Sequence, residues 1–215
     1  SARYALDCEG LNVSTEFFLP AGRAAIGMRC DVTNRRAAPI TLVMTPALRP
    51  YVNAPALAPW DKPEWYLKTG FCSDQRFGFW TQLLNSNTDV TKRRVVALWS
   101  AGENLTGAEI SYEKFIGQGS FDQPESVVRD RLRLTPSDAR AWGVYGDSNT
   151  FYAYPPVYAL QYEVTLEPEQ TWGLRQVFSL LPRGSDGFLP TVEQAREPAV
   201  FLDDSAVLRL QRPER

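Results

Sequence analysis

The sequence predicts an all-β protein built from two antiparallel sheets packed face to face. Three observations lead to this fold class. Apolar and polar residues alternate along many segments, turn residues separate those segments, and helical periodicity is almost absent. Alternation with a period of two is typical of a strand that buries one face, so these segments together favour a sandwich over a helical fold.

Alternation is clear in the first half of the chain. In residues 25–33, Ile26, Met28, Cys30 and Val32 are expected to share the buried face. Gly, Pro, Asn and Asp residues separate the alternating segments and supply the turns. The strands expected in this half are residues 11–19, 25–33, 40–44, 77–84 and 94–100.

Residues 46–63 contain five prolines, at positions 46, 50, 55, 59 and 63. Proline removes a backbone donor and fixes φ, so this stretch is expected to be a long irregular loop without a ladder strand. It leads into an aromatic segment, residues 63–69, that also carries a carboxylate and an amine.

A long hairpin dominates the second half, with a turn at residues 167–170. One face of its first strand is expected to hold Tyr158, Leu160, Tyr162, Val164 and Leu166. The return strand is expected to oppose them with Leu174, Val177 or Phe178, and Leu180. Such regular alternation favours a sheet with one buried face.

The remaining segments are less regular. Residues 131–135 alternate as a short strand would, and residues 150–156 form an aromatic edge before the hairpin. Only residues 189–199 have modest helical character, and residues 206–210 are either a last strand or part of a linker. We therefore predict one β-sandwich domain at residues 1–184. Residues 185–215 are expected to be a C-terminal extension or a linker toward a domain that this sequence lacks.

Composition excludes several functional classes. The 215 residues carry a formal net charge of −2, which gives no strong attraction to nucleic acid or to an anionic membrane. No apolar run approaches the ~20 residues that span a bilayer. The three cysteines form an odd set without a Cys-x-x-Cys spacing, which favours a reducing compartment and a cytoplasmic location.

Histidine is absent from the sequence, and this removes much enzyme chemistry. No histidine-based triad, zinc site or general base can be built from this chain alone. There is no Gly-x-Ser-x-Gly elbow, phosphate-binding loop or dinucleotide fingerprint. The carboxylate doublet Asp203 and Asp204 points to opposite faces of any strand. We therefore expect no catalytic residue, no metal site and no cofactor in this chain.

Residues 111–120, SYEKFIGQGS, form the first candidate binding segment. Its two glycines permit positive φ and a close approach of the backbone to a ligand. Lys114, Gly117 and Gln118 are the candidate sugar contacts, through polar side chains and backbone amides. The purely structural alternative is a turn or bulge with Phe115 tucked into the core.

Residues 63–66, PEWY, form the second candidate. Aromatic rings stack on the apolar face of a pyranose, and a carboxylate accepts hydrogen bonds from its hydroxyls. Glu64, Trp65 and Tyr66 are therefore candidate carbohydrate-binding residues. The structural alternative is that Trp65 and Tyr66 close the end of the sandwich or an interface between domains.

The 111–120 segment resembles a loop of the inverting disaccharide and oligosaccharide phosphorylases of glycoside hydrolase family 94. Tyr112, Phe115, Ile116 and Gly117 carry this resemblance. Residues 158–180 resemble the hairpin that follows the loop in that family, and the likeness extends over roughly residues 10–183. The family includes cellobiose, chitobiose and β-1,2-oligoglucan phosphorylases, and PEWY is similar to the last branch.

The resemblance implies a galactose mutarotase-like supersandwich with little helix. It also implies a non-catalytic domain that supports a helical-barrel catalytic domain in the same protein, a homodimer, and an oligosaccharide or β-glucan substrate. In the family the loop reaches the sugar cleft and often carries Arg where this chain has Gln118, which lacks that fixed charge. Two alternatives stay open: a free-standing carbohydrate-binding module, and a mutarotase-like enzyme, which the lack of histidine disfavours.

Overall fold

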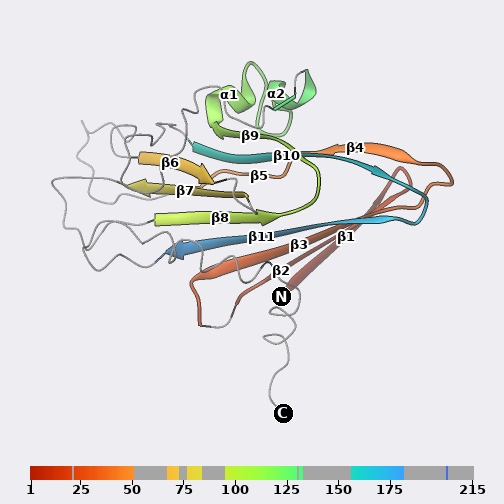
Figure 1. The fold of residues 1–215 in the computed structure, drawn as a ribbon, viewed down its shortest axis with the longest axis horizontal. Helices are drawn as coiled ribbons and strands as arrows, with labels where there is room; N and C mark the ends of the chain where they lie inside the picture. The colour runs from red at the N-terminus through yellow and green to blue at the C-terminus, as the bar shows by residue number, and fades with distance from the viewer. Residues whose placement is uncertain are drawn as a thin grey trace, which may run out of the picture.

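The computed structural model describes residues 1–20, 22–50, 67–72, 77–83, 95–129, 131–132, 156–181 and 202. These residues form two antiparallel sheets that lie one above the other, which confirms the all-β prediction (Figure 1). Residues 150–155 of the predicted aromatic edge at 150–156 lie outside the described residues, as do the helical segment at 189–199 and the last strand or linker at 206–210.

The larger sheet has seven strands in the order β1-β2-β3-β11-β8-β7-β6. Its strands are β1 Ala2–Cys8, β2 Leu11–Phe18, β3 Ala25–Asn34, β6 Leu67–Cys72, β7 Phe77–Leu83, β8 Val95–Ala101 and β11 Thr171–Leu181. Every neighbouring pair is antiparallel. Strand β1 had not been predicted; Glu9 and Gly10, with φ of 50° and 78°, form the turn that joins it to β2.

The smaller sheet is built around β10, Pro156–Leu166, in the upper layer of Figure 1. Strands β4, Ile40–Met44, and β5, Ala47–Leu48, pair with β10, as does β9, Leu105–Ser111. Strand β5 corrects the prediction of a strandless proline-rich segment. It has two residues and lies between Pro46 and Pro50, because the prolines limit the ladder on both sides.

The core lies between the sheets and confirms the predicted face of the long hairpin. Tyr158, Leu160, Tyr162, Val164 and Leu166 are each at most 2% exposed. They pack with residues of the larger sheet, among them Val32, Leu98, Trp172 and Leu174. Full burial of such a side chain contributes about 1.5–3 kcal/mol relative to its exposure, so this face stabilises the sandwich substantially.

Strand β10 is buried on its other face too, which alternation alone did not predict. Val157 and Ala159 are fully buried and pack with Phe115 and Leu132. Gln161 is also fully buried, and its amide accepts from the backbone N–H of Leu132 at 3.1 Å. A further layer therefore covers the outer side of the small sheet.

Two residues predicted to be buried are exposed: Ile26 at 47% and Leu180 at 41%. At this end of the larger sheet the opposite face is the buried one. The Phe18 ring lies over Gly27, where a Cβ would be 2.0 Å from the ring, and Val177 is fully buried. The predicted buried face therefore holds for the hairpin end of the sheet and fails at residues 26 and 180.

Two short helices were not predicted: α1, Tyr112–Ile116, and α2, Glu125–Val128. Residues 113–119 had been expected to form a loop. The Ser111 hydroxyl accepts from the backbone N–H of Lys114 at 3.4 Å and caps α1. One helical turn holds too few residues to show a periodicity, which explains the miss. The expected strand at 131–135 is absent at residues 131–132, and its remainder lies outside the described residues.

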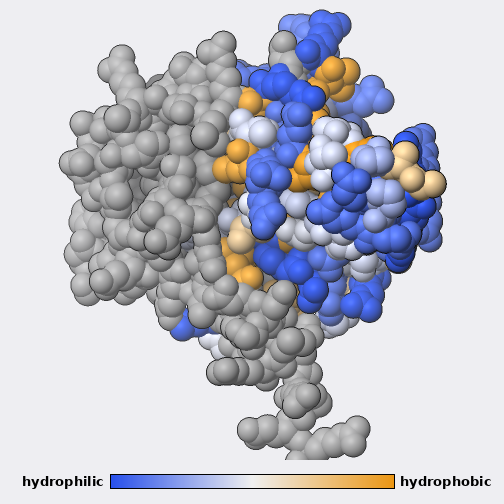
Figure 2. All heavy atoms as spheres, turned by 45° about the vertical axis from the view of Figure 1, so that its right-hand side comes forward, coloured by the Kyte–Doolittle hydropathy of each residue, from blue (hydrophilic) through white to orange (hydrophobic). Residues whose placement is uncertain are grey.

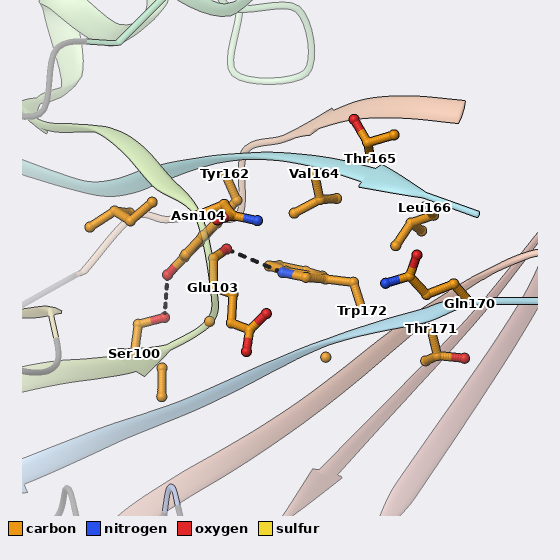
Figure 3. Close-up of a pocket in the computed structure, with 14 residues that line it drawn as sticks. Ser100, Glu103, Asn104, Tyr162, Val164, Thr165, Leu166, Gln170, Thr171 and Trp172 are labelled. Atoms are coloured by element: carbon orange, nitrogen blue, oxygen red, sulfur yellow. Dashed lines mark hydrogen bonds between the residues drawn. The ribbon is translucent and has the colours of Figure 1, made fainter. Parts of the chain in front are cut away.

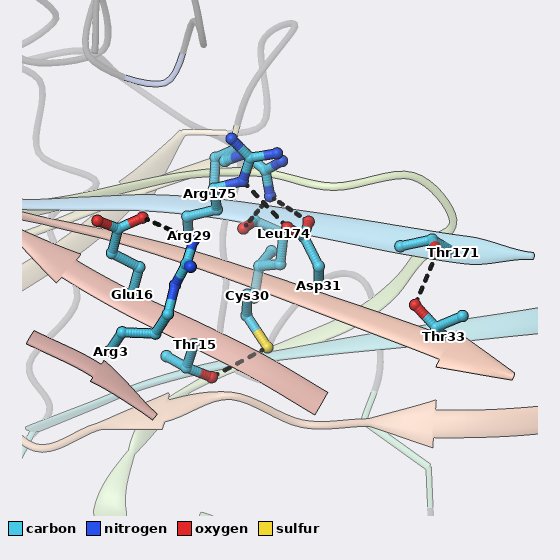
Figure 4. A network of polar contacts seen from close by, with 10 residues as sticks. All are labelled: Arg3, Thr15, Glu16, Arg29, Cys30, Asp31, Thr33, Thr171, Leu174 and Arg175. Atoms are coloured by element: carbon cyan, nitrogen blue, oxygen red, sulfur yellow. Dashed lines mark hydrogen bonds and ion pairs between the residues drawn. The ribbon is translucent and has the colours of Figure 1, made fainter. Parts of the chain in front are cut away.

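The outer face of the larger sheet carries a network of charged groups (Figure 4). Asp31 accepts from Arg29 Nε at 3.0 Å and from Arg175 at 2.9 Å. The visible face of the described residues is mostly hydrophilic, with scattered hydrophobic side chains (Figure 2). Among the described helices, none is long and apolar enough to cross a membrane.

Candidate functional site

The first candidate site is the α1–α2 loop, which we define as residues 111–129. It follows β9 and lies on the outer side of the small sheet, at the top of Figure 1. Phe115 anchors it, because this ring is 1% exposed and packs against Val157 and Ala159 of β10. The Ser126 hydroxyl also donates to the Phe115 carbonyl at 2.6 Å. The loop is thus attached to a rigid strand and to a second helix.

Glu125 organises the turn at the end of α1. Its carboxylate accepts from the backbone N–H of Gln118 at 2.8 Å and from Arg129 at 2.5 Å. Gly117 has φ of +55°, and a Cβ at this position would be 2.4 Å from Glu125 Oε2. Glycine is therefore required at position 117 both for the backbone conformation and for the close approach of the carboxylate.

The backbone donors of this turn are used within the loop. Gly117 N–H donates to the Glu113 carbonyl at 2.9 Å and Gly119 N–H to the Ile116 carbonyl at 2.8 Å. Since the Gln118 N–H is bonded to Glu125, none of the three amides remains to bind a sugar hydroxyl. This corrects the expectation that the loop offers backbone amides to a ligand, and it leaves the side chains as the contacts.

Two aromatic rings of the loop stack on each other beside an arginine. Tyr112 stacks on Phe121 with ring centroids 6.2 Å apart, and the Arg49 guanidinium carbon lies 4.1 Å above the Tyr112 ring. Phe121 is 37% exposed. The loop therefore presents a partly exposed aromatic surface next to a cation, which sequence reasoning missed because Arg49 is distant in the chain.

The structure describes only some of the predicted sugar-binding residues. Lys114, Gly117 and Gln118 are exposed and lie together at the end of α1. Glu64, Trp65 and Tyr66 lie outside the described residues. Within the described part of the chain, no cluster of three or more His, Cys, Asp or Glu residues is arranged to hold a metal ion.

A second candidate site is a pocket of about 530 Å³ at the hairpin end of the sandwich (Figure 3). The β8–β9 connection forms one wall, and β10 and the start of β11 form the others. The residues that matter most here are Ser100, Gly102, Glu103, Tyr162, Gln170 and Trp172. No motif predicted this pocket, because its walls come together only when the strands pair.

Two buried aromatic rings, Tyr162 and Trp172, form the floor of the pocket, and each makes a hydrogen bond to a neighbouring residue. The Tyr162 and Trp172 ring centroids are 5.2 Å apart, and the Trp172 indole N–H donates to the Glu103 carbonyl at 3.2 Å. The Tyr162 hydroxyl lies 2.9 Å from Ser100 Oγ. Burial raises the pKa of Tyr162 to about 12, although the Ser100 hydrogen bond lowers it in part, so the phenol stays neutral.

Comparison with known proteins gives one family. The sequence matches the family model described as glycosyl hydrolase 94, supersandwich domain, over residues 1–186. No curated protein matches it. A solved polysaccharide lyase is similar with a TM-score of 0.45 and 9% identity, over 86% of this chain and 22% of the lyase. The chain thus spans about a fifth of that lyase's length.

Proposed function

The chain belongs to the glycosyl hydrolase 94 supersandwich-domain family and is a domain of the carbohydrate-active enzyme class, and from this premise we propose its specific role. It is the non-catalytic β-sandwich domain of a glycoside phosphorylase. Such an enzyme cleaves a β-glucosidic bond with inorganic phosphate and inverts the anomeric centre. Its substrate is an oligosaccharide or β-glucan, and its location is the cytoplasm.

The observation that carries this proposal is the construction of the α1–α2 loop. Phe115 is buried against β10, and Glu125 holds the turn at Gly117 and Gln118. Lys114 and Gln118 are exposed on this fixed base. A side chain on a rigid support binds a ligand with less loss of conformational entropy than one on a mobile loop.

The side chains at the end of α1 suit sugar hydroxyls. The Gln118 amide both donates and accepts hydrogen bonds, and the Lys114 ammonium donates. A neutral amide in place of the arginine often found in the family favours contact with a hydroxyl over contact with phosphate. We assign Gln118 to a sugar hydroxyl at the edge of the cleft, with Lys114 as a second donor.

The roles of the two domains follow from the chemistry that the reaction requires. Inverting phosphorolysis needs a general acid at the leaving oxygen and a site for phosphate. In the phosphorylases that this chain resembles the general acid is an aspartate of a helical barrel, and we therefore place the acid in a helical-barrel domain of the same protein. The sandwich supports that barrel, contributes to a homodimer and supplies the α1–α2 loop to the sugar cleft.

An activity assay on two samples tests this proposal. Antibodies against the 215-residue chain isolate the native protein that carries it from cells. We expect this protein to form a sugar 1-phosphate from β-linked gluco-oligosaccharides and inorganic phosphate, and the purified chain alone to form none. Activity of the chain alone, or an inactive native protein across the β-linked substrates, would contradict the proposal.

A further inference from the structure

We propose that the pocket at the hairpin end of the sandwich binds one pyranose ring of a neutral or amine-bearing sugar. This site is separate from the α1–α2 loop, because the two share no residue. It is formed by this chain's own residues and needs no second domain. The proposal does not depend on phosphorolysis and holds or fails by itself.

The pocket has the size and the shape of a small-ligand site. Its volume of about 530 Å³ falls within the range of about 300–1,000 Å³ that is usual for such sites. Gly102 lies against the floor, where a Cβ would be 3.1 Å from a Tyr162 ring carbon and 3.2 Å from a Trp172 ring carbon. Any side chain at position 102 would therefore press on the rings and reduce the space above them.

Two polar groups face this space: the Glu103 carboxylate and the NH₂ group of the Gln170 side chain. Neither has a hydrogen-bond partner among the described residues. The Glu103 carboxylate points into the pocket, while its backbone carbonyl holds the Trp172 indole (Figure 3). The Gln170 amide oxygen accepts from the backbone N–H of Glu167 at 2.9 Å, which directs its NH₂ group toward Trp172. A carboxylate and an amide donor thus lie on either side of an indole ring.

This arrangement matches the polar chemistry of a pyranose, whose hydroxyls donate to a carboxylate and accept from an amide. The Tyr162 and Trp172 rings, 1% and 6% exposed, form the base of the pocket beneath these two groups. The hydroxyls of Tyr162 and Ser100 bond each other, and Gln176 donates to Ser100 at 3.2 Å. These groups therefore shape the floor, and Glu103 and Gln170 determine which ligand binds.

Charge narrows the class of ligand further. Among the lining residues that the structure describes, Glu103 has the only charged side chain, and none is Lys or Arg. An anion such as a sugar phosphate or a uronic acid would meet uncompensated repulsion from the carboxylate. A neutral sugar avoids this repulsion, and an amino sugar adds attraction to Glu103.

Titration of the native protein and of the 215-residue chain tests the proposal. Isothermal titration calorimetry with glucose, cellobiose and glucosamine measures affinity, with glucose 6-phosphate as the anionic probe. We expect saturable binding of a neutral or amino sugar and none of the phosphate ester. Glu103→Gln removes the carboxylate, and Gln170→Glu keeps the acceptor for Glu167 but removes the donor. Each is expected to weaken binding of a neutral sugar about tenfold, the effect of one lost charged or polar hydrogen bond.

Glu167→Gln is the matched control for Glu103→Gln, because it also removes one carboxylate from an exposed residue, here in the β10–β11 turn, and Glu167 does not line the pocket. Its affinity should equal that of the unchanged protein. Both pocket residues are exposed at their side chains, so the variants are expected to keep the fold, which thermal unfolding verifies. Absence of saturable binding for all three sugars overturns the proposal. Binding that Glu103→Gln and Gln170→Glu leave unchanged overturns it as well.

Discussion

The Glu125 carboxylate accepts a hydrogen bond from the backbone N–H of Gln118 at 2.8 Å and occupies the space that a side chain at position 117 would need. This contact joins α2 to the end of α1 and so determines how the α1–α2 loop presents its exposed side chains. The proposed sugar contact depends on this loop, which its own residue Phe115 anchors to β10.

Gly117→Ala is expected to destabilise the protein more than Gly22→Ala. Both glycines have positive φ, +55° and +69°, and Gly117 has ψ of −126°, which lies outside the left-handed helical region open to other residues. At Gly22 nothing lies within 4 Å of the new Cβ, whereas at Gly117 the Glu125 carboxylate is 2.4 Å away. Urea unfolding of both variants measures the combined effect of the backbone conformation and the close approach at Gly117. Equal losses of stability would contradict the geometry of the turn.

Phe115→Ala is expected to cost about 3–5 kcal/mol, because it leaves a cavity between α1 and β10. Phe121→Ala, at a ring that is 37% exposed, is expected to cost much less. Chemical denaturation measures both values, and hydrogen exchange of residues 111–129 reports whether the loop loosens. If the two variants lost the same stability, Phe115 would not be the anchor.

The two arginines on Asp31 predict a moderate stability effect. Asp31→Ala removes the partner of Arg29 and of the mostly buried Arg175, and we expect a loss of about 1–3 kcal/mol. Arg3→Ala is the control, since the Arg3 and Glu16 side chains are 3.7 Å apart and Arg3 is 71% exposed. Exposed pairs contribute about 0–1 kcal/mol. A larger loss for Arg3→Ala than for Asp31→Ala would refute this ranking.

Stability should fall as the pH rises from about 10 to about 12, in part because of Tyr162. Its pKa in the folded state is about 12 and its ordinary value is 10.0, so the unfolded chain releases this proton first. The contribution is fully present below pH 10 and decreases by up to about 1.4 kcal/mol per pH unit above it. Unfolding free energies of the protein and of Tyr162→Phe should converge over this window. Parallel pH profiles would show that Tyr162 does not contribute.

The sequence was sufficient to predict the long hairpin, because its strands are eleven residues long and one face of β10 is apolar without interruption. It was insufficient for β9. Gly107 interrupts that strand's pattern, and its need for glycine arises from Leu132, whose carbonyl oxygen would be 2.3 Å from a Cβ. Such a requirement comes from tertiary packing and leaves no local signal.

The sequence likewise predicted some features of the candidate sites and missed others. Gly117 stood out because a glycine pair next to a conspicuous aromatic residue is visible in a short window. The role of Glu125 was not visible, since nothing in the sequence shows that its carboxylate reaches back to Gln118. The pocket was missed entirely, because Glu103 and Trp172 meet only when β8, β10 and β11 assemble.

The most direct measurement for the proposed function is kcat/KM for phosphorolysis by the native protein with Gln118→Ala, next to Gln123→Ala. Both residues are exposed glutamines of the α1–α2 loop. We predict a loss of about tenfold for Gln118→Ala, the effect of one lost hydrogen bond to a bound sugar, with no loss for Gln123→Ala and unchanged thermal stability for both. An unchanged kcat/KM for Gln118→Ala in a correctly folded, active protein would contradict the claim that this loop contacts the substrate.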